Sequence, residues 1–362
     1  MKKTSGRTVT SPAQGFSLIE LLIAMVVTLI VCGAVMSLLM QGNQAFQVQP
    51  DMTERQQNIR AAMDVIQRDI ANAGAGLPPS AQVFSRNHNN KGAAAPSGIL
   101  SDELEMLTNS AGLDPVLPQA SQFISTSPFL LLPKFTPLDS FKSAPIPVAV
   151  VTNQAGVPFP TFALRRATYT AAPPRMTLAT GGAGPNDVCS VVGNGEASAA
   201  AATGVVYQDV VRYRIDKVAD DATQPTLLTP VLRRQSATNC GVWEIVARGI
   251  EDMRVTYRSA GDITGNPTAA ESCTSPAICP LPLTQPADMT GAVTADAILA
   301  AATVEVQVEL AARGSLYAVP GASPSKPMMT KGADNSYAFR GRLVSRGTPR
   351  AALYLQKPEV WR

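Results

Sequence analysis

The chain of 362 residues has very little histidine and few charged side chains. His88 is its only histidine, which excludes most Ser-His-Asp triads and any metal site that needs several imidazole ligands. Only 16% of the residues are charged, and 30 Lys+Arg against 27 Asp+Glu give a formal net charge of +3 without a long basic run. Electrostatic binding of nucleic acid needs a clustered basic surplus. We therefore expect no catalysis, no cofactor, no metal and no direct nucleic-acid binding.

Charge is missing altogether from one N-terminal stretch. Leu21 to Met40 contains no charged side chain, and at about 1.5 Å rise per residue such a helix covers about 30 Å, the thickness of a bilayer's hydrocarbon core. Lys2, Lys3 and Arg7 precede it in residues 1–15, which contain no acidic residue. The positive-inside bias leaves the N-terminus in the cytoplasm and sends the rest of the chain outward. We expect a single-pass membrane protein.

The residues before this stretch distinguish it from a secretory signal peptide, whose cleavage site follows the apolar region. Here the junction Gln14-Gly15-Phe16-Ser17-Leu18-Ile19-Glu20 precedes it. This pattern of basic leader, Gly-Phe, apolar run and early acid resembles the class III signal of type IV prepilins and pseudopilins. The resemblance implies that a prepilin peptidase of the inner membrane cuts between Gly15 and Phe16 and that the new N-terminal Phe16 is methylated.

Glu20 is an ionisable residue at the start of the apolar helix. Such a group costs up to about 3 kcal/mol at the membrane centre, and less near an end, so it is a candidate functional residue. The resemblance implies that its carboxylate meets the N-terminal ammonium of a neighbouring subunit in the assembled filament. The alternative is that Glu20 only lies in the headgroup region and contacts water.

An amphipathic pattern continues the helix beyond the membrane. Apolar residues recur at helical spacing from Met52 through Ile59 and Ile66 to Ala73, and Gly74 and the glycine and prolines that follow it mark a stop. Pro50 lies inside the run, where we expect it to kink or break the helix. The predicted parts are a leader at 1–15 and a stem helix at 16–76 that spans the membrane at about 16–40.

Proline becomes frequent after the stem. Leu77 to Pro174 holds 14 of the 29 prolines, and short apolar runs such as Phe129–Leu132 and Ile146–Val151 lie between them. Apolar runs bounded by proline favour edge strands and ordered loops over a linker. With an alanine-rich piece from Gly193 to Gly204, this region is predicted to form an insertion of short strands at 77–204.

The last part, 205–362, alternates with period two. Val211/Tyr213/Ile215, Met253/Val255/Tyr257 and Val304/Val306/Val308/Leu310 are apolar sets separated by polar residues. This pattern predicts half-buried strands of an antiparallel sheet with the other face wet, covered on its apolar face by the long helix. The fold class is therefore α+β.

Several segments also resemble PilW-type minor pilins and, more distantly, the J-type pseudopilins of type II secretion. The resemblance implies a pilin-like fold, in which the stem helix packs on an antiparallel sheet. The segments that carry it are Gln56–Gly76, Asp209–Ile215, Leu232–Arg234, Val246–Tyr257 and Val304–Arg313.

Cysteine is also scarce. Of five cysteines, Cys32 lies in the membrane stem, where it is expected to be an unreactive apolar residue, and four lie in the part predicted to be exported: Cys189, Cys240, Cys273 and Cys279. Four cysteines in an oxidising compartment allow three pairings. We favour Cys273–Cys279 with Cys189–Cys240. A zinc site is the alternative, but the Cys273–Cys279 spacing is wrong for a zinc pair and no histidine accompanies it.

Two other features stay open. Asp187, Asp220 and Asp221 are acids that a calcium site can use, but the spacing of an EF-hand is absent and solvated acids are the simpler interpretation. Trp243 and Trp361 are either core residues or part of a binding surface.

The resemblance implies a minor type IV pilin that primes pilus assembly or sits at the tip, because its headpiece is large for a repeating lattice. It would lie in the inner membrane with a periplasmic headpiece and later in the extracellular filament, and so serve adhesion and twitching motility. Its partners would be prepilin peptidase, major and minor pilins, the assembly platform, a possible tip adhesin and, before assembly, the lipid bilayer. The alternatives are a pseudopilin of a type II secretion or DNA-uptake system, an adhesin or binding module on a pilin stem, and, least favoured, a membrane-anchored enzyme.

Overall fold

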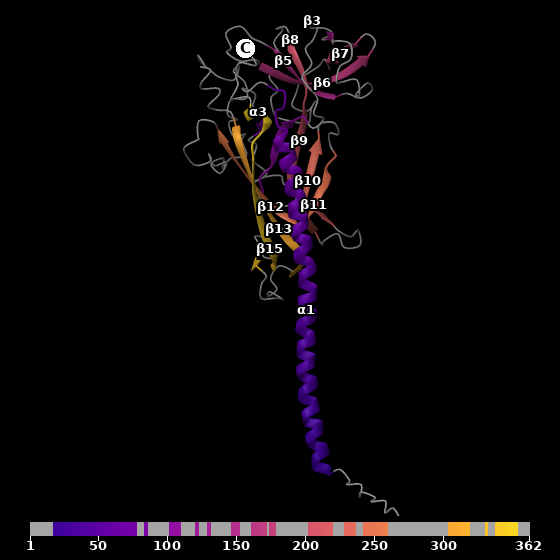
Figure 1. Cartoon of the computed structure of the whole chain (residues 1–362). Helices are drawn as coiled ribbons and strands as arrows, with labels where there is room; N and C mark the ends of the chain where they lie inside the picture. The colour runs from indigo at the N-terminus through magenta and orange to yellow at the C-terminus, as the bar shows by residue number, and fades with distance from the viewer. Residues whose placement is uncertain are drawn as a thin grey trace, which may run out of the picture. The chain divides into compact units, whose positions relative to one another are not determined.

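The computed structural model places two units, Met1–Thr53 and Glu54–Arg362 (Figure 1). The residues that the structure describes are 17–77, 83–85, 101–109, 120–122, 129–131, 146–152, 161–171, 174–178, 202–219, 228–236, 242–259, 303–318, 330–331 and 337–353.

Helix α1 runs from Leu18 to Ala71 without interruption, with Pro50 inside it. The expected break at Pro50 is therefore wrong. Proline removes a single i→i−4 hydrogen bond, and the turns on either side keep theirs. The Thr53 hydroxyl adds a bond next to this point by donating to the carbonyl oxygen of Gln49 at 3.0 Å.

The helix ends at Ala71, a few residues before the glycines that mark a stop in the sequence. Gly74 and Gly76 have φ of 67° and 84°, the left-handed conformation that ends helices and that glycine adopts at low cost. A side chain at Gly74 would also collide with the Cβ of Ala351, 2.6 Å from the position of an added Cβ. Ala351 belongs to the short helix α3 (Arg350–Leu353), and its amide donates to the carbonyl oxygen of Ala73 at 3.1 Å.

The predicted strands of the C-terminal part form two antiparallel sheets and not one. The first sheet has the order β1-β2-β9-β10-β11 and the second the order β12-β13-β15-β14. Their bounds are β1 Phe84–Ser85, β2 Leu104–Thr108, β9 Asp209–Ala219, β10 Leu228–Ser236, β11 Glu244–Arg248, β12 Ile250–Ser259, β13 Thr303–Ala318, β14 Thr330–Lys331 and β15 Tyr337–Gly347.

The first sheet is separated from the second at Gly249. It joins β11 to β12 with φ of 76°, and a Cβ there would lie 2.8 Å from the carbonyl oxygen of Arg313. The Gly249 amide donates to Pro230 and its carbonyl accepts from Arg313, both at 2.8 Å. The chain therefore turns out of the first sheet and into the second at this residue.

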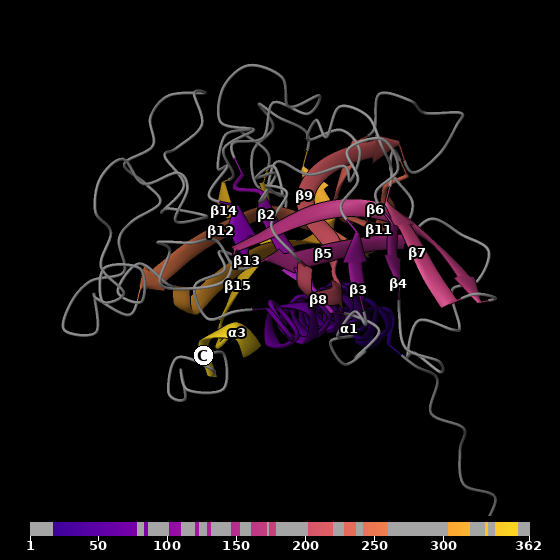
Figure 2. The ribbon, with the colours of Figure 1, turned by 90° about the horizontal axis from the view of Figure 1, so that it is seen from above.

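One apolar core lies between α1 and both sheets. The predicted stripe Ile59, Met63, Ile66, Ile70 and Ala73 is buried, and so are the alternating apolar residues of β9, β12 and β13. The opposite side of the helix carries exposed residues such as Arg60, Asp64 and Arg68. Figure 2 shows the strands on one side of the helix. From Glu54 onward, the apolar stripe of the helix and the apolar residues of these strands thus belong to one buried cluster.

A third antiparallel sheet has the order β3-β4-β7-β6-β5-β8. Its bounds are β3 Ala120–Gln122, β4 Phe129–Leu131, β5 Ile146–Thr152, β6 Thr161–Ala171, β7 Pro174–Leu178 and β8 Ala202–Tyr207. Both predicted apolar runs are strands, but neither is an edge strand, since β4 and β5 each have two neighbours. Pro147 is tolerated in β5 because pairing with β8 starts only at Val148.

Candidate functional site

The first turn of α1 contains Glu20, whose side chain is exposed. The Ser17 amide donates to Glu20 Oε2, and the Ile19 amide donates to Ser17 Oγ, both at 3.4 Å. This reciprocal arrangement is a capping box, in which side chains satisfy amides that have no partner within the helix. Sequence reasoning missed it, although the Ser-x-x-Glu spacing from Ser17 to Glu20 was the signal that could have found it.

The apolar part of α1 is Leu18–Met40, 23 residues with a mean hydropathy of 2.7 and no residue buried within the structure. By length and composition it can cross a membrane. Thr28 is compatible with such an environment, because its hydroxyl donates to the Ala24 carbonyl oxygen at 2.7 Å. Cys32 is exposed on the same helix and forms no disulfide.

Several predicted site residues lie outside the described part of the chain. They are the leader, the junction residues Gly15 and Phe16, and the cysteines Cys189, Cys240, Cys273 and Cys279. Their cleavage, methylation and pairing stay predictions. Among the residues that the structure does describe, no group of three or more His, Cys, Asp or Glu side chains is placed to hold a metal ion.

The extramembrane half of α1 is fixed to the first sheet by one buried carboxylate. Asp69 is 7% exposed, and its Oδ2 accepts hydrogen bonds from the Tyr213 hydroxyl of β9 and from Arg234 Nε of β10, the latter at 3.0 Å. Arg234 Nε also donates to the Tyr213 oxygen at 3.3 Å. We call these three residues the helix anchor.

The helix anchor changes the acid–base behaviour of its members. Burial raises the pKa of the Tyr213 hydroxyl far above its ordinary value, and the Asp69 carboxylate raises it further, against the opposing effect of Arg234. For Arg234, burial alone lowers the pKa, but the charge of Asp69 and the hydrogen bonds to Asp69 and Tyr213 outweigh it and the pKa rises. Arg234 therefore stays protonated and Tyr213 neutral over the whole physiological pH range.

Three segments that lie far apart in the sequence meet at this anchor. Asp69 comes from Gln56–Gly76, Tyr213 from Asp209–Ile215, and Arg234 from Leu232–Arg234. The sequence alone gave no indication of this meeting, because the contacts of Asp69 reach across 144 and 165 residues.

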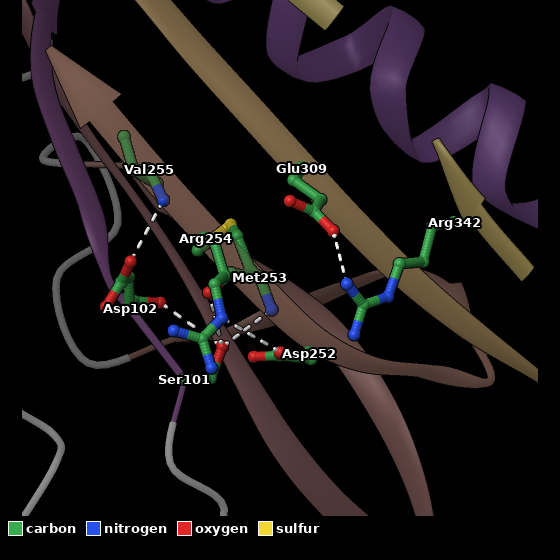
Figure 3. Close-up of polar contacts among 8 residues, drawn as sticks. All are labelled: Ser101, Asp102, Asp252, Met253, Arg254, Val255, Glu309 and Arg342. Carbon is green, nitrogen blue, oxygen red and sulfur yellow. Dashed lines mark hydrogen bonds and ion pairs between the residues drawn. The ribbon is translucent and has the colours of Figure 1, made fainter. Parts of the chain in front are cut away.

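A second polar cluster protects the free edge of β12 (Figure 3). The Met253 amide donates to Ser101 Oγ and the Val255 amide donates to Asp102 Oδ2, both at 2.9 Å, while the Asp102 amide donates to the Met253 carbonyl. Two side chains thus take the place of a neighbouring strand on an edge that would otherwise attract other chains.

Beside this edge, Asp252 is partly buried. Burial raises its pKa above the ordinary value of 3.8, and the charge of Asp102 adds to the increase, while Arg254, with its Nε 3.4 Å from Asp252 Oδ2, opposes it. On the same sheet Arg342 lies 3.0 Å from Glu309 and is mostly exposed (Figure 3). The outer face of this sheet thus carries ion pairs both within a strand and between strands, of the kind usual on solvated sheets.

The outer face of the first sheet is less exposed to solvent than expected. Glu105 and Asp216 are buried there, paired with Arg212 and with Arg214. The Arg214 guanidinium carbon lies 4.0 Å from the ring centroid of Trp243, a cation–π contact. Trp243 is half-buried, so it belongs neither to the core nor to an open aromatic surface.

These clusters indicate what the described residues can do. An apolar helix whose first turn is capped by a glutamate can enter a membrane or a helix bundle. A buried ion pair attaches the other half of the helix to the folded sheets. The arrangement is suited to carrying the headpiece on the helix.

Residues 10–36 match the family described as Prokaryotic N-terminal methylation motif. This range includes Gly15, Phe16 and Glu20. No curated protein and no solved structure was found to match the chain. The motif and the apolar helix together indicate a type IV pilin-like protein that is processed by a prepilin peptidase, anchored in the inner membrane and later assembled with other pilins.

Proposed function

We propose that this chain is a minor type IV pilin of the PilW type, which helps to prime pilus assembly or occupies the filament tip. One observation carries the proposal: the methylation motif at residues 10–36 overlaps an exposed apolar helix whose N-terminus is capped by the Glu20 side chain. The helix is the part that enters the filament, and the sheets from Phe84 to Gly347 form the headpiece that it carries.

Processing prepares the helix for assembly. A cut between Gly15 and Phe16 removes Lys2, Lys3 and Arg7, so the charges that hold the N-terminus at the cytoplasmic face are lost. The exposed side chains of Leu18–Met40 then exchange lipid for the helices of neighbouring subunits.

Glu20 sets the register between the helices of neighbouring subunits. The cut creates an ammonium on Phe16, and a neighbour's ammonium is a partner for the exposed Glu20 carboxylate. Such a pair is stronger where the dielectric constant is low. The attraction between two unit charges about 4 Å apart grows from about 1 kcal/mol in water to about 4 kcal/mol at an effective dielectric constant of 20. A subunit without this carboxylate leaves a buried amine unpaired.

Size favours a tip or priming position. Residues 16–362, which follow the proposed cut, number 347. Each subunit of a repeating lattice must fit its headpiece beside those of its helical neighbours, so a large headpiece is easier to place at an end. The same argument holds for a pseudopilus, and co-purification with pilus or with secretion components distinguishes the two.

The proposal is tested by complementation of a deletion strain whose assembly machinery is intact. We expect the strain to carry few surface pili and the wild-type gene to restore them. Glu20→Ala should be processed but should not restore piliation. Glu54→Ala, which changes an exposed glutamate on the extramembrane half of the same helix, is the matched control and should restore it. Normal pilus numbers in the deletion strain, or full rescue by Glu20→Ala, would contradict the proposal.

A further inference from the structure

The third sheet is built entirely from one stretch of the chain. Strands β2 and β9 are antiparallel neighbours in the first sheet, and their last pair is Thr108 with Asp209. Antiparallel neighbours can be joined by a turn of two residues. Between Asn109 and Gln208, however, the chain makes all six strands β3 to β8, and no strand of the third sheet comes from elsewhere in the described residues.

The third sheet also has a buried layer of its own. Alternate residues of β5 face opposite sides, and Ala149 and Val151 contribute to the core under α1. The residues between them belong to a different buried set, which that core does not include. This set is Ile146, Val148, Val150, Ala167, Tyr169, Met176, Val205 and Tyr207.

The polar contacts that hold α1 lie outside this stretch. The helix anchor uses β9 and β10, and the protected edge of β12 uses Ser101 and Asp102, which precede it. Gln208, the first residue after it, closes the junction, because its Nε2 donates to the carbonyl oxygen of Ala75 at 2.7 Å. From β3 to β8 the core under α1 receives three apolar side chains, Ala149, Val151 and Val206, and most of that core comes from the helix and the first two sheets.

We propose that residues 110–207 are a module inserted into the β2–β9 hairpin, which unfolds independently of the rest of the headpiece and which assembly does not require. The chain is thus divided between an assembly part, made of α1 with the first two sheets, and a displayed part. The displayed module is where surface recognition can vary without change to the contacts that hold the helix.

Two substitutions form a matched test in the full chain. Val148 of β5 and Val308 of β13 are both fully buried in strands with two neighbours. Val148→Asp and Val308→Asp each bury a carboxylate without a partner. Amide hydrogen exchange of the detergent-solubilised protein then reports which strands open together.

We expect Val148→Asp to remove protection in β5, β6 and β8 and to leave β9, β12 and β13 protected. Val308→Asp should remove protection in β9, β12 and β13. The milder Val148→Ala should accelerate exchange in β5, β6 and β8 only. Loss of protection in β12 and β13 in either Val148 variant, complete unfolding included, would overturn the proposal, as would unchanged exchange in β5 with Val148→Asp.

A deletion variant tests whether assembly needs the module. It joins Asn109 to Gln208 through Asn-Gly, a sequence suited to tight hairpin turns. We expect protected β12 and β13 and restored piliation in the deletion strain, and unfolding of those strands or failure to restore pili would contradict the proposal. The exchange measurements do not depend on the protein being a pilin, so failure of the pilin assignment, reported by Glu20→Ala, is distinguishable from failure of this inference.

Discussion

Asp69 is the residue on which the placement of the extramembrane helix most depends. It is a buried carboxylate whose charge is compensated by Arg234 and by the Tyr213 hydroxyl. A buried charge is tolerated only when it is paired and hydrogen-bonded, and removal of this one side chain takes away the acceptor of the Tyr213 hydroxyl and the counter-charge of Arg234.

We predict that Asp69→Asn destabilises the chain by about 2 kcal/mol, since a hydrogen bond to a charged group contributes roughly 1.5–3 kcal/mol. Asp64→Asn is the control on the same helix, because Asp64 is exposed and a change there should stay within about 0.5 kcal/mol. Thermal unfolding of the detergent-solubilised protein measures the difference. Equal midpoints for the two variants would show that the helix anchor does not hold the helix.

Tyr213 gives the anchor a signature at alkaline pH. Its pKa is raised above the ordinary value of 10.0 by burial and by Asp69. Above that pH the unfolded chain loses the phenolic proton while the folded chain keeps it, so stability falls as pH rises, by about 1.4 kcal/mol per pH unit.

We expect the stability of Tyr213→Phe to fall less steeply with rising pH than that of the wild type, because the variant has no phenolic proton at this position. Denaturant unfolding at several pH values from 9 to 11 measures the slope. Identical slopes for wild type and variant would contradict the raised pKa of Tyr213.

Asp252 should give a pH dependence of the same sign, but at acid pH. Its folded pKa is raised above 3.8, so the folded chain binds a proton before the unfolded chain does, and this group adds stability as pH falls toward that value. Relative to Asp252→Asn, the wild type should therefore gain stability between neutral pH and about pH 4. A wild type that loses stability relative to the variant over this range would contradict the assignment.

Sequence reasoning at the residue scale identified Glu20 but not Asp69. Glu20 is conspicuous because it interrupts a run of apolar residues. Asp69 lies among alternating charged and apolar residues like any solvated acid, and only the contacts with distant strands show that it points inward.

At the scale of elements, glycines decide where the chain changes direction. The end of α1 at Gly74 was predictable, since glycines and prolines follow an apolar stripe of helical period. The turn at Gly249 was not, because Val246–Tyr257 reads as one strand-like segment and nothing in it marks a change of sheet.

Gly249→Ala should destabilise the protein by about 1–3 kcal/mol, the cost of forcing an ordinary residue into a positive φ, with a further clash against the Arg313 carbonyl. Gly204→Ala is the control, since an added Cβ there would lie 3.8 Å from Val151, an ordinary contact. Chemical denaturation of the two variants checks the prediction. Similar midpoints would show that the conformation of Gly249 carries no strain for alanine.

At the scale of the whole molecule, local patterns predicted the elements better than their arrangement. The alternation of apolar and polar residues predicted the buried faces of β9, β12 and β13, and the apolar stripe of helical spacing predicted the buried face of α1. The number of sheets and the place of β1 and β2, which join the first sheet although they lie within 77–204, depend on pairings between distant segments. Such pairings leave no periodic signal in the sequence.

The central claim is that the chain is a pilin-like subunit, made as a precursor and cut before assembly. Mass spectrometry of the protein isolated from its host measures this most directly. The account predicts a native protein that lacks residues 1–15 and begins with an N-methylated Phe16. A native protein that keeps residues 1–15 in cells with an active prepilin peptidase would contradict it.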